Sequence, residues 1–395
     1  MATSIPIPEA EPTQAAGGIL VLLATLPLEQ IESVIAKLTE SFPPESLLIA
    51  TAEEFAPGAH PALRIVPVPA TGTSWTLTAA EFANVYQLAE KHEAKAILIL
   101  GPEAGSLGTF VLRDLAKVVL ESDVDLAVPR YDLPPHAGLV NSAILYPLSR
   151  ALFASRTRFP LAIDLGLSPR MAERLAMVAH RHTNVRQDGA PMWPVNEACV
   201  AGFAVGEVDG GTRVLPQPAQ MDLNAILPLV AGSLFADIEA KAAFWQRARQ
   251  LPPSHRPYPI TQGLASETAD AASLIQGFRL AYSNLLEIWS IVLPPNTLLG
   301  LKRLSLTDAA EFRMPESLWA RIVYDFVLAY RLHTLNRGHL FGALIPLYLA
   351  WVASHIHITA SGVSPEHHVE AVAAAFEAEK PYLVSRWRWP DRFNP

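Results

Sequence analysis

The sequence predicts an open α/β sheet followed by a largely helical C-terminal part. Three observations indicate this fold class. Short runs made only of apolar residues, as buried parallel strands require, recur early in the chain at residues 19–23, 47–50 and 96–100. Segments with the residue spacing of amphipathic helices separate these runs. From Asn224 onward the strand-like runs stop and long helical patterns replace them.

The expected elements alternate between strand and helix over about 130 residues, which is typical of an open α/β sheet. We expect strands at residues 19–23, 47–50, 63–68, 96–100 and 124–128. We expect helices at residues 28–38, 79–92 and 107–120. Ligands of such sheets bind beyond the carboxyl ends of the strands, so the turns after Leu23, Ala50 and Leu100 are candidate sites.

The length of the chain, 395 residues, predicts two domains, because single cores seldom grow beyond about 250–300 residues. We expect a disordered leader at 1–17, a sheet domain at 18–222 and a helical domain at 223–395. The leader lacks the basic start of a secretory signal. Cys199 is the single cysteine, which excludes a disulfide within the chain. Both features favour a cytoplasmic protein.

Charge and hydropathy exclude two classes of partner. The net charge is −8 and no cluster of Lys and Arg forms a basic face, so a nucleic-acid partner is not expected. Residues 338–365 contain no Lys, Arg, Asp or Glu, which raises the question of a membrane span. His355, His357 and Pro346 interrupt this segment, and it lacks the usual flanking belts. A buried core helix is therefore expected, with no membrane span.

Residues 131–168 read YDLPPHAGLVNSAILYPLSRALFASRTRFPLAIDLGLS. This stretch resembles the glucosylglycerate and mannosylglycerate synthases, which are retaining glycosyltransferases with a GT-A fold. In that family an Asn-Ser pair precedes a Tyr-Pro-Leu-(Thr/Ser)-Arg-Ala-Leu run, and a Gly-Gly-Asp-Phe-Gly turn follows. The matching residues are Asn141, Ser142, Tyr146, Pro147, Leu148, Arg150, Ala151, Leu152, Asp164 and Gly166. The resemblance extends from about residue 80 to 388, and it implies a GT-A-like open mixed sheet flanked by helices.

The resemblance also implies a function and a set of site residues. The family transfers a hexose from a nucleotide sugar to a small acceptor such as glycerate or phosphoglycerate. Asp164 corresponds to a catalytic position, and its alternative role is a structural cap. Gly101 and Glu103 fall on the donor side of the cleft, although Glu103 also fits a solvated loop acid. Asn141 and Arg150 fall on the acceptor side, and their alternatives are a loop contact and a structural ion pair.

The sequence departs from the family where a divalent cation would bind. The family holds Mg²⁺ or Mn²⁺, which neutralises the departing diphosphate, through an Asp-x-Asp motif. Here Gly101-Pro102-Glu103-Ala104 stands in that place, and a family Asp corresponds to Pro191. A metal-binding His of the family falls near Leu215, where there is none. The chain is therefore expected to be a degenerate member without a metal site, and with weak or absent transfer activity.

Two functions remain open from the sequence. The chain is either a glycosyltransferase with altered or metal-independent donor binding, or a non-catalytic protein that binds a sugar, a nucleotide or a partner. The weakly charged C-terminal helices are also consistent with a homo-oligomer. No zinc set is expected among the histidines. His355 and His357 are predicted core groups, whereas His367 and His368 are predicted to be exposed at the start of a helix.

Overall fold

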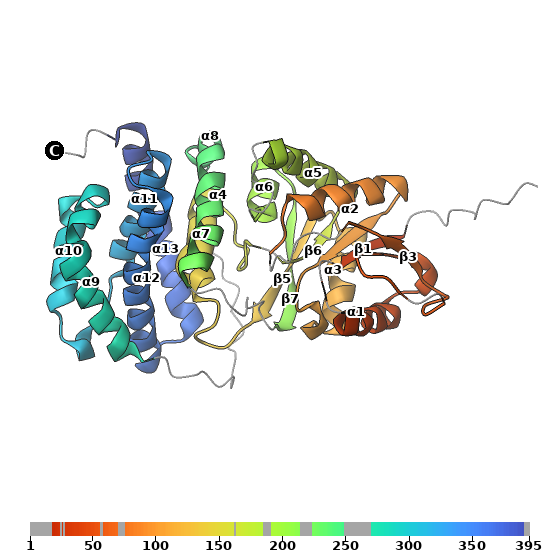
Figure 1. Cartoon of the computed structure of the whole chain (residues 1–395), viewed down its shortest axis with the longest axis horizontal. Coiled ribbons are helices and arrows are strands. Elements are labelled where there is room, and N and C mark those ends of the chain that lie inside the picture. The colour runs from red at the N-terminus through yellow and green to blue at the C-terminus, as the bar shows by residue number, and fades with distance from the viewer. Residues whose placement is uncertain are drawn as a thin grey trace, which may run out of the picture.

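The computed structural model of the protein describes residues 18–23, 26, 28–55, 58–69, 76–161, 163–184, 191–213, 223–248 and 270–390. The expected leader at 1–17 lies outside the described residues. A sheet part and a helical part lie side by side along the longest axis of the molecule (Figure 1).

The sheet part is built on a seven-stranded mixed sheet with the strand order β3-β2-β1-β4-β6-β5-β7. Its strands are β1 (Ile19–Leu23), β2 (Leu47–Thr51), β3 (Arg64–Pro67), β4 (Ala96–Leu100), β5 (Leu126–Asp132), β6 (Asp164–Leu167) and β7 (Val205–Thr212). Strand β6 runs antiparallel to β4 and β5, and every other pair is parallel. The carboxyl ends of six strands and the amino end of β6 therefore meet at one edge of the sheet.

Helices cover both faces of this sheet (Figure 1). Helices α1 (Leu28–Ser41) and α3 (Thr109–Glu121) lie on one face, and α2 (Ala79–Lys91) and α5 (Pro169–Asn184) lie on the other. Successive side chains of a strand point to opposite faces. In β1 this places Val21 in the core with α1 and α3, and Leu22 in the core with α2 and α5.

The predicted alternation of strands and helices is confirmed in its order. The strand expected at 124–128 lies slightly later and is longer, at Leu126–Asp132. Strands β6 and β7 were absent from the prediction. Glycine and acidic residues interrupt both of them (DLGL and VGEVDGGT), so neither gives the continuous apolar run of a buried strand.

From residue 223 onward the described residues form helices joined by short connections and no strand, as expected. This helical part contains α7 (Leu223–Ala240), α8 (Ala242–Trp245), α9 (Ala271–Val292), α10 (Pro295–Leu306), α11 (Glu316–Arg331), α12 (Arg337–Ala360) and α13 (Pro365–Arg388). An earlier segment joins the same core, namely the π-helical turn Asn141–Leu145 and α4 (Tyr146–Phe153). The fold class, a mixed α/β sheet with a helical C-terminal part, is confirmed.

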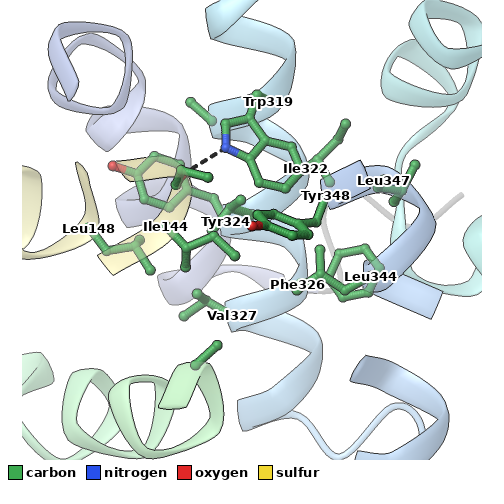
Figure 2. Close-up of a cluster of buried hydrophobic side chains, with 14 of the residues drawn as sticks. Ile144, Leu148, Trp319, Ile322, Tyr324, Phe326, Val327, Leu344, Leu347 and Tyr348 are labelled. Atoms are coloured by element: carbon green, nitrogen blue, oxygen red, sulfur yellow. Dashed lines mark hydrogen bonds between the residues drawn. The ribbon is translucent and has the colours of Figure 1, made fainter. Parts of the chain in front are cut away.

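Helix α11 lies at the centre of the helical core (Figure 2). The side chain of Trp319, in this helix, is fully buried. Its indole Nε1 donates a hydrogen bond to the Ala143 carbonyl oxygen at 2.8 Å. Ile144 and Leu148 approach α11 from the turn before α4 and from α4 itself (Figure 2). One side chain of α11 thus joins the helical part to the segment that follows β5.

Two described helices, α7 and α12, are long and apolar enough to cross a membrane by length and composition. In the protein, 39% of the most apolar window of α7 and 67% of that of α12 is buried. The burial of most of α12 fits the core helix that was expected around residues 338–365.

Candidate functional site

The turn after β4 lies at the sheet edge where the strand ends meet. It begins with Gly101, and a Cβ atom at that position would lie 2.5 Å from the Ile163 carbonyl oxygen. No side chain fits there without a backbone shift, so the close approach of this turn to Ile163 requires glycine. Glu103 has a φ of 64°, a left-handed conformation, and it ends the turn before the short helix Ala104–Ser106.

Asp164 is the first residue of β6, and it pairs with Leu100 in the sheet register. Its carboxylate is fully buried. It accepts hydrogen bonds from the Gly101 amide at 3.1 Å, the Tyr131 hydroxyl at 2.5 Å and Arg213 Nε at 3.0 Å. A buried carboxylate is stable only with such partners, and here both oxygens have them.

Arg213 follows the last residue of β7 and extends into the turn after β4. Its side chain is fully buried and forms an ion pair with Asp164. It also donates to the Pro102 carbonyl oxygen at 2.7 Å, to Ser106 Oγ at 2.9 Å and to the Glu103 carbonyl oxygen. The planar guanidinium, with five N–H donors, satisfies several acceptors at once. One cationic side chain therefore holds the whole turn.

Tyr131, in β5, completes this buried group. Burial raises its pKa well above the usual value, and the negative charge of Asp164 raises it further, against the opposing effect of Arg213. The hydroxyl consequently stays neutral and donates its proton to Asp164 Oδ2. The Arg213 guanidinium lies 5.9 Å from the centre of the Tyr131 ring. We call Asp164, Arg213 and Tyr131 the buried ion-pair cluster.

The described residues do not fit Mg²⁺ or Mn²⁺ at this turn. Among them there is no group of three or more His, Cys, Asp or Glu side chains that could hold a metal ion. The Asp164 oxygens are already engaged by N–H and O–H donors, and the adjacent guanidinium repels a dication. Pro191 offers no ligand, and the position near Leu215 lies outside the described residues. The cationic group at this turn is Arg213, and Asp164 neutralises its charge.

Three of the residues that the sequence predicted for the site lie together. Gly101 and Asp164 are hydrogen-bonded, and Glu103 joins them through its carbonyl oxygen, which binds Arg213. The Glu103 side chain is partly exposed. Sequence reasoning missed Tyr131 and Arg213. Tyr131 opens the stretch that resembles the synthases, and Arg213 stands two residues before the position that corresponds to the family's histidine.

Asn141 and Arg150 lie elsewhere, where α4 meets α13. Asn141 Nδ2 donates to the Arg158 carbonyl oxygen at 3.0 Å, which satisfies a loop carbonyl. Arg150 forms ion pairs with Glu370 at 2.5 Å and Glu377 at 3.0 Å. Both contacts match the structural alternatives, a loop contact and an ion pair. The acceptor-side roles of Asn141 and Arg150, like the catalytic role of Asp164, stay predictions.

Arg158 joins the sheet part to α13. Its backbone N–H donates to Glu207 in β7 at 2.8 Å, and its side chain donates to Glu366 at 3.1 Å and to Ser142 at 2.9 Å. The guanidinium lies 5.2 Å from the centre of the Tyr146 ring. Buried and partly buried charges thus fix the two parts of the molecule to each other.

The expectation for His355 as a core group is confirmed, and that for His368 is wrong. Both imidazoles are buried and stacked, and their Nδ1 atoms are 2.7 Å apart. Trp351 stacks on both rings. His367 is exposed as predicted. Neighbouring residues on a helix point in different directions, so the pair His367 and His368 divides between solvent and core.

The buried histidine pair predicts a loss of stability in mild acid. Burial, followed by the charge of a protonated His368, lowers the pKa of His355 to about 3, so the folded state keeps it neutral. The unfolded chain takes up the proton near pH 6.5. The stabilisation is therefore complete above pH 6.5 and falls by about 2 kcal/mol on going to pH 5, at 1.36 kcal/mol per pH unit.

Urea unfolding between pH 5 and 7 checks this. The His355→Gln variant is expected to show a smaller fall in the free energy of unfolding than the unchanged protein. His339 is exposed on α12, so His339→Gln is the matched control and should leave the pH dependence unchanged. Equal pH dependence in the unchanged protein and the His355→Gln variant would contradict the prediction.

No protein-family model matches the chain, and no curated protein matches it. Among solved structures, it is similar to glucosyl-3-phosphoglycerate synthase from Mycobacterium tuberculosis. The complex with Mn²⁺, UDP and glucosyl-3-phosphoglycerate is 16% identical, with 56% of this chain and 80% of that chain covered and a TM-score of 0.37. The complex with phosphoglyceric acid is 17% identical, with the same coverage and a TM-score of 0.36. Similarity at this level leaves the function of the chain to be argued from its own residues.

Proposed function

We propose that the chain is a glycosyltransferase-like protein that does not carry out the family's metal-dependent transfer. Its donor edge, by which we mean the turn after β4 with Gly101 and Glu103, works without a divalent cation. The sequence resemblance supports the relation to enzymes that move a hexose from a nucleotide sugar to glycerate or phosphoglycerate. The observation that carries the rest is the position of Arg213, which holds the turn between Gly101 and Glu103.

The physical reason is electrostatic. A leaving diphosphate needs a counter-ion, and a bound metal supplies it in the family. The guanidinium of Arg213 is buried and already neutralised by Asp164, so it is not available to take up new negative charge. A nucleoside diphosphate or nucleotide sugar would bind at this edge through neutral contacts. Its transfer to an acceptor would lack the stabilisation that a cation provides.

Isothermal titration with UDP and UDP-glucose, with and without Mn²⁺, tests the proposal. We expect the affinity for UDP to change less than about twofold on adding Mn²⁺. A metal ion that bridged the diphosphate to the protein would instead raise the affinity about tenfold or more, as one charge-assisted interaction does. In the same solutions, phosphoglycerate and UDP-glucose should release no UDP above the rate without protein.

Glu103→Gln is the matched variant, because Glu103 is the carboxylate that replaces the family's motif. It should respond to Mn²⁺ as the unchanged chain does. An increase in UDP affinity with Mn²⁺ that disappears in Glu103→Gln would refute the metal-free edge. Failure to bind UDP in any condition would refute nucleotide binding and leave a protein or sugar partner as the alternative.

A further inference from the structure

A cavity of about 440 Å³ lies between α10 and the start of α11. Small-molecule pockets in proteins range from about 300 to 1,000 Å³, so its size suits a small ligand. Helix α10 belongs to the end of the helical part that is farthest from the sheet (Figure 1). The cavity is therefore separate from the donor edge, and a ligand there would bind independently of the proposed function.

One face of α10 forms a wall of the cavity. Asn296, Thr297, Gly300, Leu304 and Thr307 line it and recur at helical spacing. A Cβ atom on Gly300 would lie 2.9 Å from a methyl carbon of Leu318 in α11, so the glycine lets the two helices approach closely. Leu304 and Leu318 give the cavity an apolar floor.

Three guanidinium groups surround this apolar floor: those of Arg303, Arg313 and Arg321. Two of them have carboxylate partners, since Arg313 pairs with Glu316 at 3.2 Å and Arg321 with Glu379 at 2.8 Å. No Asp or Glu is among the described lining residues, and Arg303 forms no ion pair with a described residue. The cavity thus carries a net positive charge in a protein whose overall charge is −8.

Two further groups offer hydrogen bonds to an anion. Thr297 lines the cavity and is only 4% exposed, and its hydroxyl makes no hydrogen bond to another described residue. Ser317 and Leu318 are in the first turn of α11, where amide N–H groups have no acceptor within the helix. The residue before this helix is Pro315, which has no side-chain acceptor to cap it, and the acidic residue of the first turn, Glu316, is paired with Arg313. A helix N-terminus of this kind favours negative charge.

We propose that this cavity binds a phosphomonoester whose uncharged body is partly apolar. The phosphate would lie between Arg303, the Thr297 hydroxyl and the first turn of α11. Arginine suits this role because its planar donors match the oxygens of phosphate. The body of the ligand would rest on Leu304 and Leu318.

Isothermal titration of the full chain with inorganic phosphate and phenyl phosphate, at an ionic strength of about 0.15 M, tests the site. Phenyl phosphate is expected to bind more tightly, because only it covers the apolar floor. Arg303→Gln should weaken binding of both probes by about tenfold, the change expected from one lost charge-assisted hydrogen bond. Thr297→Val, which keeps the side-chain volume, should weaken binding about fivefold through one neutral hydrogen bond.

Lys302→Gln is the matched control, because Lys302 is the neighbouring exposed cation on α10 and does not line the cavity. It should change both affinities by less than about twofold. The charge of Lys302 would not contact the phosphate, and dissolved salt screens the attraction between charges that are not in contact. Circular dichroism should show the same helix content in all variants. Equal weakening by Arg303→Gln and Lys302→Gln, equal affinity for the two probes, or no binding of either probe would overturn the proposal.

Discussion

Replacing Arg213 by methionine is expected to lower the free energy of unfolding by about 3–5 kcal/mol, which is typical when one partner of a buried ion pair is removed. The change leaves the Asp164 carboxylate fully buried with its charge uncompensated. It also removes the donors to the Pro102 carbonyl oxygen and Ser106 Oγ. Urea unfolding followed by circular dichroism measures the effect.

Arg113→Met is the matched control, because the Arg113 side chain is 56% exposed and pairs with its neighbour Asp114 in solvent. It should change stability by no more than about 0.5 kcal/mol. The double variant Asp164→Leu with Arg213→Met should recover part of the loss, since an apolar pair leaves no buried charge. A loss below about 1 kcal/mol in Arg213→Met would mean that the guanidinium does not hold the turn.

Replacing Trp319 by alanine is expected to cost about 3–5 kcal/mol, the usual range for a buried tryptophan. The indole is fully buried at the centre of the helical core (Figure 2), so its removal leaves a cavity lined by α11, α12 and the turn before α4. Trp319→Phe keeps most of the apolar contact but loses the hydrogen bond to the Ala143 carbonyl oxygen, which costs about 0.5–1.5 kcal/mol.

The losses of unfolding free energy in Trp319→Ala and Trp319→Phe separate the contribution of packing from that of the hydrogen bond. Trp389 is 62% exposed, and Trp389→Ala should be neutral within about 0.5 kcal/mol. Thermal and urea unfolding of the three variants give the comparison. Equal losses for Trp319→Ala and Trp389→Ala would contradict the central position of Trp319 in the core.

Much of the sheet could be predicted because its central strands are buried on both faces. Strands β1, β2 and β4 are fully buried, so their sequences are continuous apolar runs. Strand β7 lies at the edge of the sheet, and its exposed residues Glu207 and Asp209 alternate with the buried Val208 and Gly210. Such a strand depends on its neighbour for its structure, and single-sequence patterns carry little of that information.

The candidate site could be predicted only in part. The turn after β4 and Asp164 follow from strand ends and from the resemblance. The Arg213 contacts do not, because 49 residues separate Arg213 from Asp164 along the chain and no local pattern links them. The prediction that His368 is exposed was wrong for a similar reason, because its burial depends on how α13 packs against Trp351.

The central claim is that the Arg213–Asp164 ion pair holds the turn between Gly101 and Glu103, and that this turn binds no divalent cation. Electron paramagnetic resonance of Mn²⁺ added to the protein with UDP tests it most directly, because bound Mn²⁺ loses the sharp signal of the free ion. The account predicts no more bound Mn²⁺ than UDP alone holds. One additional Mn²⁺ per chain, lost in the Glu103→Gln variant, would contradict it.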